Sequence, residues 1–174
     1  MQNIYLFRHF KVKDSSSSWL NSNEFDKWVK DYDTFELEYS DIVLSKNIDK
    51  IYVSSQNRAI KSADFLNLDY EINDLLVEVP IKSFINTKFK LPKWLWLFFG
   101  RVAWFFNLKQ LETKEETNER IENFIQNLDM NSNILIISHG FFMMLLVKKL
   151  KKIGYTENIS TKMSNGKVYI LENK

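Results

Sequence analysis

The 174-residue sequence contains no cysteine and only two histidines, His9 and His139. The lack of cysteine excludes a disulfide framework, a thiolate nucleophile and a zinc–thiolate site. Two histidines are too few for a multi-histidine metal site, so we expect neither a metal nor another cofactor. The formal net charge is only +2, which provides no strong field for nucleic acid or for an acidic membrane.

Long apolar runs are also absent. No stretch reaches the roughly 18 apolar residues that a membrane-spanning helix requires. The first residues, MQNIYLFRH, lack the basic region and the long apolar region of a signal peptide. We therefore expect a cytoplasmic protein. The length fits a single domain, residues 1–174, and 45% hydrophobic residues with 15% aromatic residues are enough for a packed core.

Short apolar segments alternate with segments of helical periodicity along the chain. Strand-like segments are Ile4–Phe7, Asp49–Ser54, Asp74–Val79, Ile134–Ile137 and Val168–Leu171. Helical segments are 25–32, the stretch that Ser55 or Asn57 could cap, the stretch opened by a Thr113–Glu116 capping box, and Phe141–Lys152. This alternation predicts an α/β fold, a three-layer sandwich with a mostly parallel central sheet flanked by helices.

Polar side chains follow three of the predicted strands. Arg8 and His9 end the first strand, Arg58 follows the second, and His139 follows the strand over Ile134–Ile137. Parallel strands would bring these side chains to one edge of the sheet, where ligands bind in open α/β folds. Arginine clamps phosphate oxygens and neutral imidazole is a nucleophile, so the set suits a phosphoryl group. Taken one by one, the histidines could be structural and Arg58 could simply pair with an acid.

Four motifs in the same order resemble the histidine phosphatase superfamily, which includes the phosphoglycerate mutases. They are Leu6-Phe7-Arg8-His9, Ser54-Ser55-Gln56-Asn57-Arg58-Ala59, Leu76-Val77-Glu78-Val79-Pro80 and Ser138-His139-Gly140. A Leu-Pro-Lys-Trp-Leu-Trp run also resembles small bacterial members. The resemblance implies a phosphoglycerate mutase-like fold, with His9 as the phosphorylated nucleophile. It further implies that Arg8, Arg58 and His139 bind the phosphoryl group and that a carboxylate donates a proton.

One position departs from the family pattern. The family usually has glycine directly after the first Arg-His, whereas this chain has Phe10. Glycine lets the backbone approach phosphate closely and adopt a positive φ. We therefore expect Phe10 to narrow the entrance of the site. The Thr or Ser that usually follows is also missing, and Lys11 and Lys13 could contact a phosphate instead.

Glu78 is the candidate proton donor. It lies in an apolar, strand-like segment, where burial would raise its pKa toward the value that a general acid needs. The alternative is an exposed carboxylate on a half-buried strand. Glu71, Asp74 and Glu112 are weaker candidates because their surroundings are more polar.

An aromatic segment, residues 94–106, contains three Trp and four Phe. It is too short to span a bilayer and too apolar for an ordinary surface helix. We expect it to pack into the core or to form a subunit contact, for instance in a homodimer. A wall over the site that favours an apolar leaving group is a second reading. Membrane attachment ranks third, so membrane contact is not expected.

Together these features predict a metal-independent hydrolase of phosphomonoesters that works through phosphohistidine on His9. The expected partner is a phosphorylated small molecule rather than nucleic acid. A phosphomutase on the same fold remains an alternative. A second alternative is a non-catalytic module that holds a phosphorylated ligand, and Phe10 in place of glycine favours it.

Overall fold

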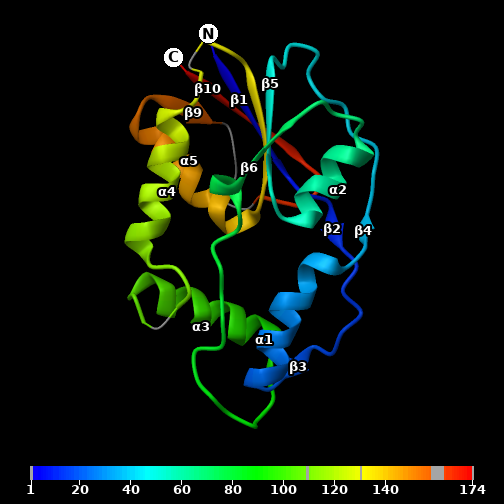
Figure 1. Cartoon of the computed structure of the whole chain (residues 1–174), viewed down its shortest axis with the longest axis vertical. Coiled ribbons are helices and arrows are strands. Elements are labelled where there is room, and N and C mark those ends of the chain that lie inside the picture. The colour runs from blue at the N-terminus through cyan, green and yellow to red at the C-terminus, as the bar shows by residue number, and fades with distance from the viewer. Residues whose placement is uncertain (1, 109, 130, 158–162, 174) are drawn as a thin grey trace.

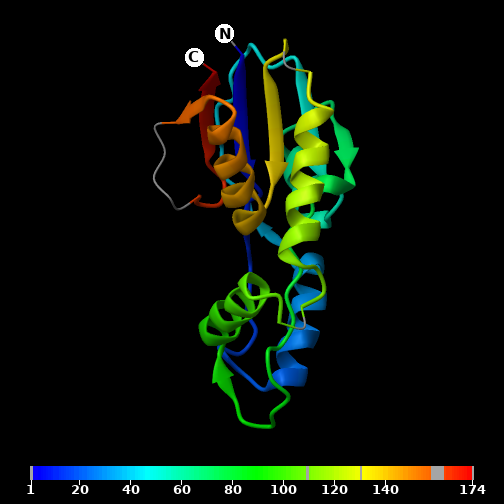
Figure 2. The same cartoon turned by 90° about the vertical axis from the view of Figure 1, so that its left-hand side faces the viewer.

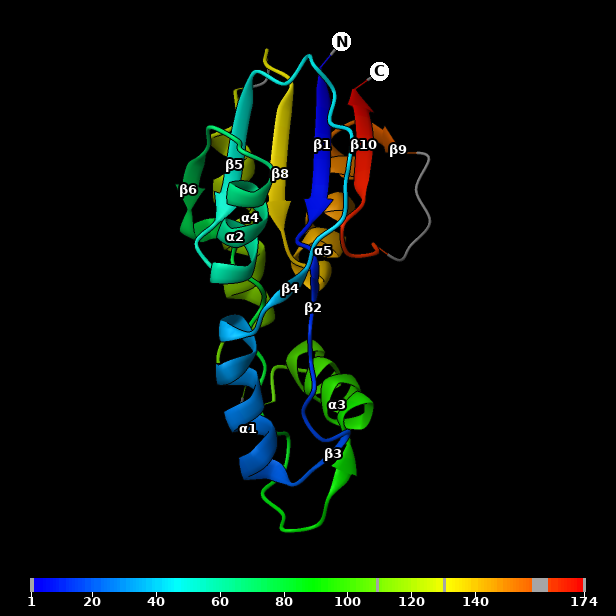
Figure 3. The ribbon, with the colours of Figure 1, turned by 90° about the vertical axis from the view of Figure 1, so that its right-hand side faces the viewer.

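The larger part of the molecule, at the top of Figure 1, is built around a six-stranded sheet with the strand order β6-β5-β8-β1-β10-β9, which Figure 3 shows face-on. A computed structural model describes residues 2–108, 110–129, 131–157 and 163–173. The strands are β1 (Asn3–Arg8), β5 (Lys50–Ser54), β6 (Glu71–Asn73), β8 (Ile134–Ser138), β9 (Tyr155–Glu157) and β10 (Val168–Asn173). Strands β6, β5, β8 and β1 are parallel, and β10 is antiparallel to its neighbours β1 and β9. The predicted mostly parallel sheet is confirmed.

Helices cover both faces of this sheet. Helices α4 (Lys114–Gln126) and α5 (Gly140–Lys152) cover one face (Figure 2), and α2 (Asn57–Phe65) covers the other (Figure 3). Alternation along β1 sends Ile4 and Leu6 toward α4 and α5, and Tyr5 and Phe7 toward α2. The three-layer α/β sandwich is thereby confirmed. The Thr113–Glu116 capping box at the start of α4 is confirmed as well.

A smaller lobe lies beyond the carboxyl ends of the parallel strands (Figures 1 and 3). It contains α1 (Ser22–Asp31), the 3₁₀ turn η1 (Tyr32–Thr34), α3 (Lys93–Phe105), and the paired short strands β3 (Trp19–Leu20) and β7 (Leu91–Pro92). Its buried centre is formed by Leu20, Phe25, Ile81 and Trp96. Trp96 stacks on Phe25 and donates its indole N–H to the carbonyl of Leu20 at 2.8 Å. A further short pair, β2 (Lys11–Val12) and β4 (Leu37–Glu38), lies between the lobe and the sheet.

The prediction of an extended strand over Asp74–Val79 is wrong. Asp74–Leu76 forms a 3₁₀ turn, η2, directly after the short strand β6. The Asn73 side chain accepts from the amide of Leu75, which favours the turn. Arg120 of α4 donates to the carbonyls of Leu75 and Val77 at 2.7 and 2.9 Å. Side-chain donors thus satisfy backbone groups that would pair with a neighbouring strand in a sheet.

Candidate active site

The carboxyl ends of β1, β5 and β8 carry the residues that the sequence singled out. Arg8 is the last residue of β1, and its register partner in β8 is Ser138. The amide of His9 donates to the carbonyl of Ser138 at 3.2 Å, so the two strand ends stay joined beyond the sheet. Arg58 lies in the first turn of α2, and His139 occupies the N-cap of α5. The sheet edge therefore brings both arginines and both histidines together.

A cavity of about 620 Å³ opens at this edge, lined both by residues of the sheet edge and by residues of α1 and α3 in the smaller lobe. Arg8, His9, Arg58 and Glu78 line it, whereas His139 does not. The cavity lining combines these charged side chains with a largely apolar wall. The apolar wall is contributed by Trp28, Val29, Tyr32, Val79, Pro80, Ile81, Leu97, Phe141, Met144 and Met163.

The His9 ring is held in one tautomer. Its Nδ1 lies 2.7 Å from the carbonyl oxygen of Phe10, which can only accept, so Nδ1 carries the proton. Within the described residues no hydrogen bond involves Nε2. The Asn165 amide donates to the His9 carbonyl at 2.9 Å and fixes the backbone beside the ring. This arrangement leaves Nε2 as a lone-pair nitrogen on a residue that lines the cavity.

Both imidazoles are neutral at physiological pH. Burial lowers the pKa of His9 from 6.5 to about 3, and the positive charges of Arg58 and Arg8 add to this effect. Burial and the charge of Arg58 also hold the pKa of His139 well below its usual value. A neutral His9 is the form that can act as a nucleophile.

His139 is completely buried and contacts Arg58 rather than the cavity. Arg58 Nε donates to His139 Nδ1 at 3.1 Å, so the other ring nitrogen, Nε2, carries the proton and donates to the Ser54 hydroxyl at 2.8 Å. The two histidine ring centroids are 5.2 Å apart. Both ring nitrogens of His139 are therefore occupied by protein groups. A phosphoryl oxygen would reach His139 only by replacing one of them.

Arg58 is fixed by two further residues that the sequence analysis did not select. Its Nη1 forms an ion pair with Asp33 at 2.9 Å, and its Nη2 donates to Gln56 at 2.9 Å. Asp33 also accepts from the amides of Asn57 and Arg58 at 2.9 and 3.2 Å. Asp33 therefore caps α2 from outside the helix. Neither Ser55 nor Asn57 is the cap, because the N-cap position is Gln56 and its side chain makes no capping bond.

Arg8 lies against the first residue of α5. A Cβ placed on Gly140 would be 2.8 Å from Arg8 Cζ and 3.0 Å from Arg8 Nε, so only glycine leaves room for the guanidinium there. Arg8 Nη1 donates to the carbonyl of Met163 at 2.8 Å. Its buried Nε has no hydrogen-bond partner among the described residues. A buried charged donor without a partner is costly, which points to an anionic ligand at this place.

Glu78 lies in more polar surroundings than the sequence suggested. Its side chain is only 19% exposed, but its carboxylate accepts from the amides of Phe141 and Phe142 at 3.2 and 2.9 Å. These amides belong to the first turn of α5, where a carboxylate complements the helix dipole. Arg101 Nη2 is 3.9 Å from the same carboxylate. The expected apolar environment is therefore wrong, although Glu78 does line the cavity.

Phe10 does not narrow the entrance. Its side chain is 1% exposed and lies in the core between the sheet and α2, with the rings of Phe7, Tyr39 and Phe65 within 5.4 Å. It does not line the cavity, and its φ is not positive. Its amide donates to the Ser62 hydroxyl at 3.0 Å. The position after Arg8-His9 therefore anchors this loop to α2.

Arg101 of α3 provides a further cation in the cavity, whose lining also includes Lys30. Its Nη1 donates to the carbonyl of Val79 at 2.8 Å, and its guanidinium lies 4.1 Å above the Phe141 ring. Burial lowers the pKa of Arg101, while the carboxylates of Glu78 and Glu112 oppose this shift. A single arginine within an otherwise apolar segment was the sequence signal that could have identified it. The reading of the aromatic segment as one wall of the site is therefore correct for Leu97 and Arg101.

No group of three or more His, Cys, Asp or Glu side chains among the described residues could hold a metal ion. No helix in the described part of the chain is long and apolar enough to cross a membrane.

Comparison with known proteins identifies the family. Residues 40–174 match the model of the histidine phosphatase superfamily (branch 1). The chain therefore belongs to this superfamily, to which the phosphoglycerate mutase-like proteins belong. The matched range begins after Arg8 and His9, so their position rests on the structure. No curated protein sequence matches the chain.

Solved structures share the fold over nearly the whole chain. The α-ribazole phosphatase from Shigella flexneri is 18% identical, with a TM-score of 0.56 over 97% of this chain and 89% of that one. A phosphoserine phosphatase from Entamoeba histolytica in complex with 3-phosphoglyceric acid is 13% identical, with a TM-score of 0.55 over 98% and 90%. A mycobacterial glucosyl-3-phosphoglycerate phosphatase is 12% identical, with a TM-score of 0.55 over 99% and 91%. At these identities the similarity establishes the fold alone.

Proposed function

We propose that this chain is a phosphomonoester hydrolase that works through a phosphohistidine on His9. The observation that carries the proposal is a neutral imidazole, fixed by Phe10 at Nδ1, on the wall of a cavity that Arg8 and Arg58 also line. A lone-pair nitrogen beside two guanidiniums is suited to attack phosphorus while the charge on the phosphoryl oxygens is stabilised.

The proposed reaction has two transfers. In the first, His9 Nε2 forms a bond to phosphorus as the bond to the leaving oxygen breaks, and Glu78 supplies the proton that this oxygen needs. In the second, water attacks phosphorus, its proton passes to Glu78, and the N–P bond breaks to release inorganic phosphate. The amides of Val79, Phe141 and Phe142 donate to the Glu78 carboxylate, so protonation of Glu78 weakens these hydrogen bonds. Arg8 and Arg58 hold the phosphoryl oxygens in both steps.

His139 is a positioning residue in this scheme. Its Nδ1 accepts from Arg58 Nε, while Asp33 and Gln56 hold the two outer nitrogens of the same guanidinium. Together they set the direction in which Arg58 presents its remaining N–H groups. The apolar cavity wall suits a phosphomonoester with an apolar leaving group.

Hydrolysis of an aryl phosphate by the wild type and by His9→Ala tests the proposal. We expect turnover by the wild type and none above background by His9→Ala. Vanadate should raise the melting temperature of both proteins, because Arg8 and Arg58 remain in the variant and a ligand of the folded state stabilises it. Equal turnover by the two proteins would disprove the role of His9. Vanadate binding without turnover by the wild type would instead identify a non-catalytic phosphate-binding module.

A further inference from the structure

Helix α3 is apolar on both of its faces. The inner face packs Trp96, Gly100, Ala103 and Trp104 against the rest of the molecule. The outer face carries Trp94, Phe98 and Phe105, which are 65%, 57% and 55% exposed. A helix that is apolar all round is normally buried on all sides, yet this one has large side chains in solvent. Its outer face is therefore an unpartnered surface.

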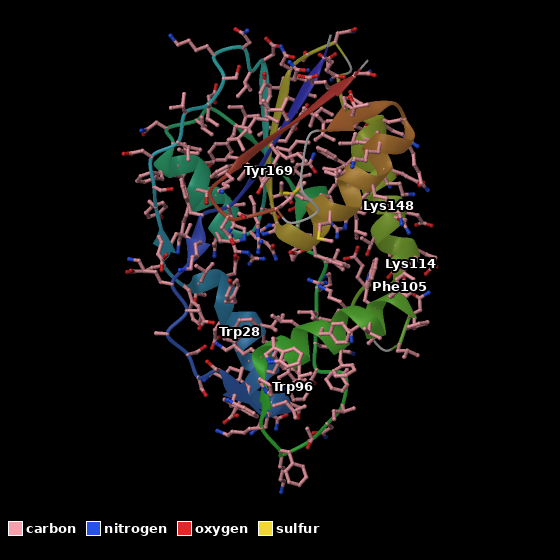
Figure 4. The ribbon with its side chains drawn as sticks, turned by 180° about the vertical axis from the view of Figure 1, so that it is seen from behind. Trp28, Trp96, Phe105, Lys114, Lys148 and Tyr169 are labelled. Atoms are coloured by element: carbon pink, nitrogen blue, oxygen red, sulfur yellow. The ribbon has the colours of Figure 1, made fainter. Side chains whose placement is uncertain are left out.

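The exposed apolar surface extends past the end of α3. We call this surface the docking face. It consists of the outer-face residues Trp94, Phe98 and Phe105 and of five further exposed apolar residues, Leu97, Phe99, Phe106, Leu108 and Leu111. Exposed tryptophan and phenylalanine side chains gathered in this way mark an interaction site. Figure 4 shows Phe105 at the far end of α3 from Trp96, with Lys114 beside it.

Positive charge accompanies the docking face. Residues 79–111 contain six Lys or Arg and no Asp or Glu, which gives this segment a formal charge of +6. Because the whole chain has a net charge of +2, the other residues together carry −4. Lys90 and Lys93 pair with Glu24 and Asp14, whereas Lys88 and Lys114 form no ion pair among the described residues. The Lys114 ammonium lies 4.4 Å above the Phe105 ring, at the border of the docking face.

The acids that follow the docking face in sequence are only partly neutralised. Glu112 forms an ion pair with Arg120 at 3.0 Å, and Glu115 accepts from Asn107 at 2.7 Å. A second copy of this chain placed on the docking face would therefore bring two segments with an excess of positive charge together, with few carboxylates to offset it. Like charges across an interface disfavour association. An anionic lipid surface supplies the opposite charge together with an apolar layer beneath it.

We propose that the docking face of α3 binds an anionic lipid surface. Tryptophan and phenylalanine would lie at the level of the headgroups with lysine at the border, the pattern of interfacial helices. Leu97 belongs both to the docking face and to the cavity wall. The mouth of the cavity would therefore lie beside the lipid. Lipid binding needs no chemistry at His9, so this proposal can be tested independently of the proposed function.

Sedimentation with vesicles tests the proposal on the full chain. We expect it to bind vesicles that contain phosphatidylglycerol, and to bind at least about 10-fold more weakly to pure phosphatidylcholine, since each basic residue near an anionic surface favours binding by a factor of about 5. Combined Trp94→Ser, Phe98→Ser and Phe105→Ser substitutions should weaken binding by about 100-fold or more. Val43→Ser and Ile170→Ser, at exposed apolar positions outside the docking face, are the matched controls.

Tryptophan fluorescence provides a second readout. Trp94 is 65% exposed, whereas Trp96 and Trp104 are buried, so anionic vesicles should shift the emission to the blue. Trp94→Phe should retain binding and lose most of this shift. Circular dichroism verifies that each variant is folded.

Three results would overturn the proposal. The first is no binding to anionic vesicles by a folded wild type. The second is unchanged binding by the triple variant, which would move the contact to another face. The third is a dimer in sedimentation equilibrium that dissociates in the triple variant, since this would assign the docking face to a second copy of the chain.

Discussion

The two buried histidines predict a specific loss of stability in mild acid. The unfolded chain binds a proton on His9 with a pKa near 6.5, whereas in the folded protein this pKa is about 3. Between these values the unfolded state holds more protons than the folded state. The contribution of His9 to the free energy of unfolding is therefore fully present above pH 6.5, and it is lost as the pH falls toward 3.

The size of the effect follows from the same two values. Lowering the pH from 7.5 to 5 should reduce the free energy of unfolding by about 2 kcal/mol through His9 alone. His139 adds a loss of the same sign, because its pKa is also lowered in the folded protein. The chain has no other histidine. Carboxylates such as Asp129, whose pKa is lowered to about 2, mainly affect more acidic solutions.

Urea unfolding at pH 7.5, 6 and 5 measures this loss. In His9→Asn the decrease between pH 7.5 and 5 should be smaller than in the wild type by about 2 kcal/mol, because the proton uptake by His9 is gone. His139→Asn should likewise flatten the dependence. The reasoning would be refuted by a wild-type stability that is constant over this range, or by identical pH dependence in the wild type and both variants.

Three further predictions concern single residues. Phe10→Ala should lower the free energy of unfolding by about 3–5 kcal/mol in urea titration while leaving KM for an aryl phosphate unchanged, since the ring is in the core; a raised KM at unchanged stability would place Phe10 in the site. Gly140→Ala should weaken vanadate binding by about 10-fold or more in a thermal-shift titration, because its Cβ displaces the Arg8 guanidinium and a hydrogen bond to a charged group is lost; unchanged affinity would remove Arg8 from the anion site. Glu78→Gln should slow hydrolysis of an alkyl phosphate by about 10²- to 10⁴-fold and of an aryl phosphate by much less, because a phenol leaves without protonation; equal losses in steady-state assays would exclude Glu78 as the proton donor.

Positions next to regular strands were the part of the site that the sequence could predict. Arg8 ends the apolar strand β1 and His9 follows it directly, while His139 follows the fully buried strand β8. Once the strands are parallel, their ends must meet at one edge, so proximity follows from the pattern. Periodicity does not predict which way a side chain points after a strand ends. For this reason it missed both the burial of Phe10 in the core and the position of His139 behind Arg58.

Contacts between distant segments were the part that could not be predicted. Asp33 lies at the start of a stretch without clear periodicity, and it meets Arg58 25 residues later in the chain. Glu78 lies among apolar neighbours in sequence, yet the first turn of α5, more than 60 residues away, supplies its hydrogen bonds. Folding brings these polar groups to residues whose local sequence is apolar. Local composition therefore predicted the wrong environment for Glu78.

A phosphoryl group trapped on His9 is the most direct test of the proposed mechanism. The protein is mixed with an aryl phosphate, denatured at alkaline pH to preserve phosphohistidine, and digested for mass spectrometry. We predict one added phosphoryl group on the peptide that contains His9, and none in His9→Ala. An active enzyme without this modification, or with the phosphoryl group only on a peptide that contains His139, would contradict the assignment of His9 as the nucleophile.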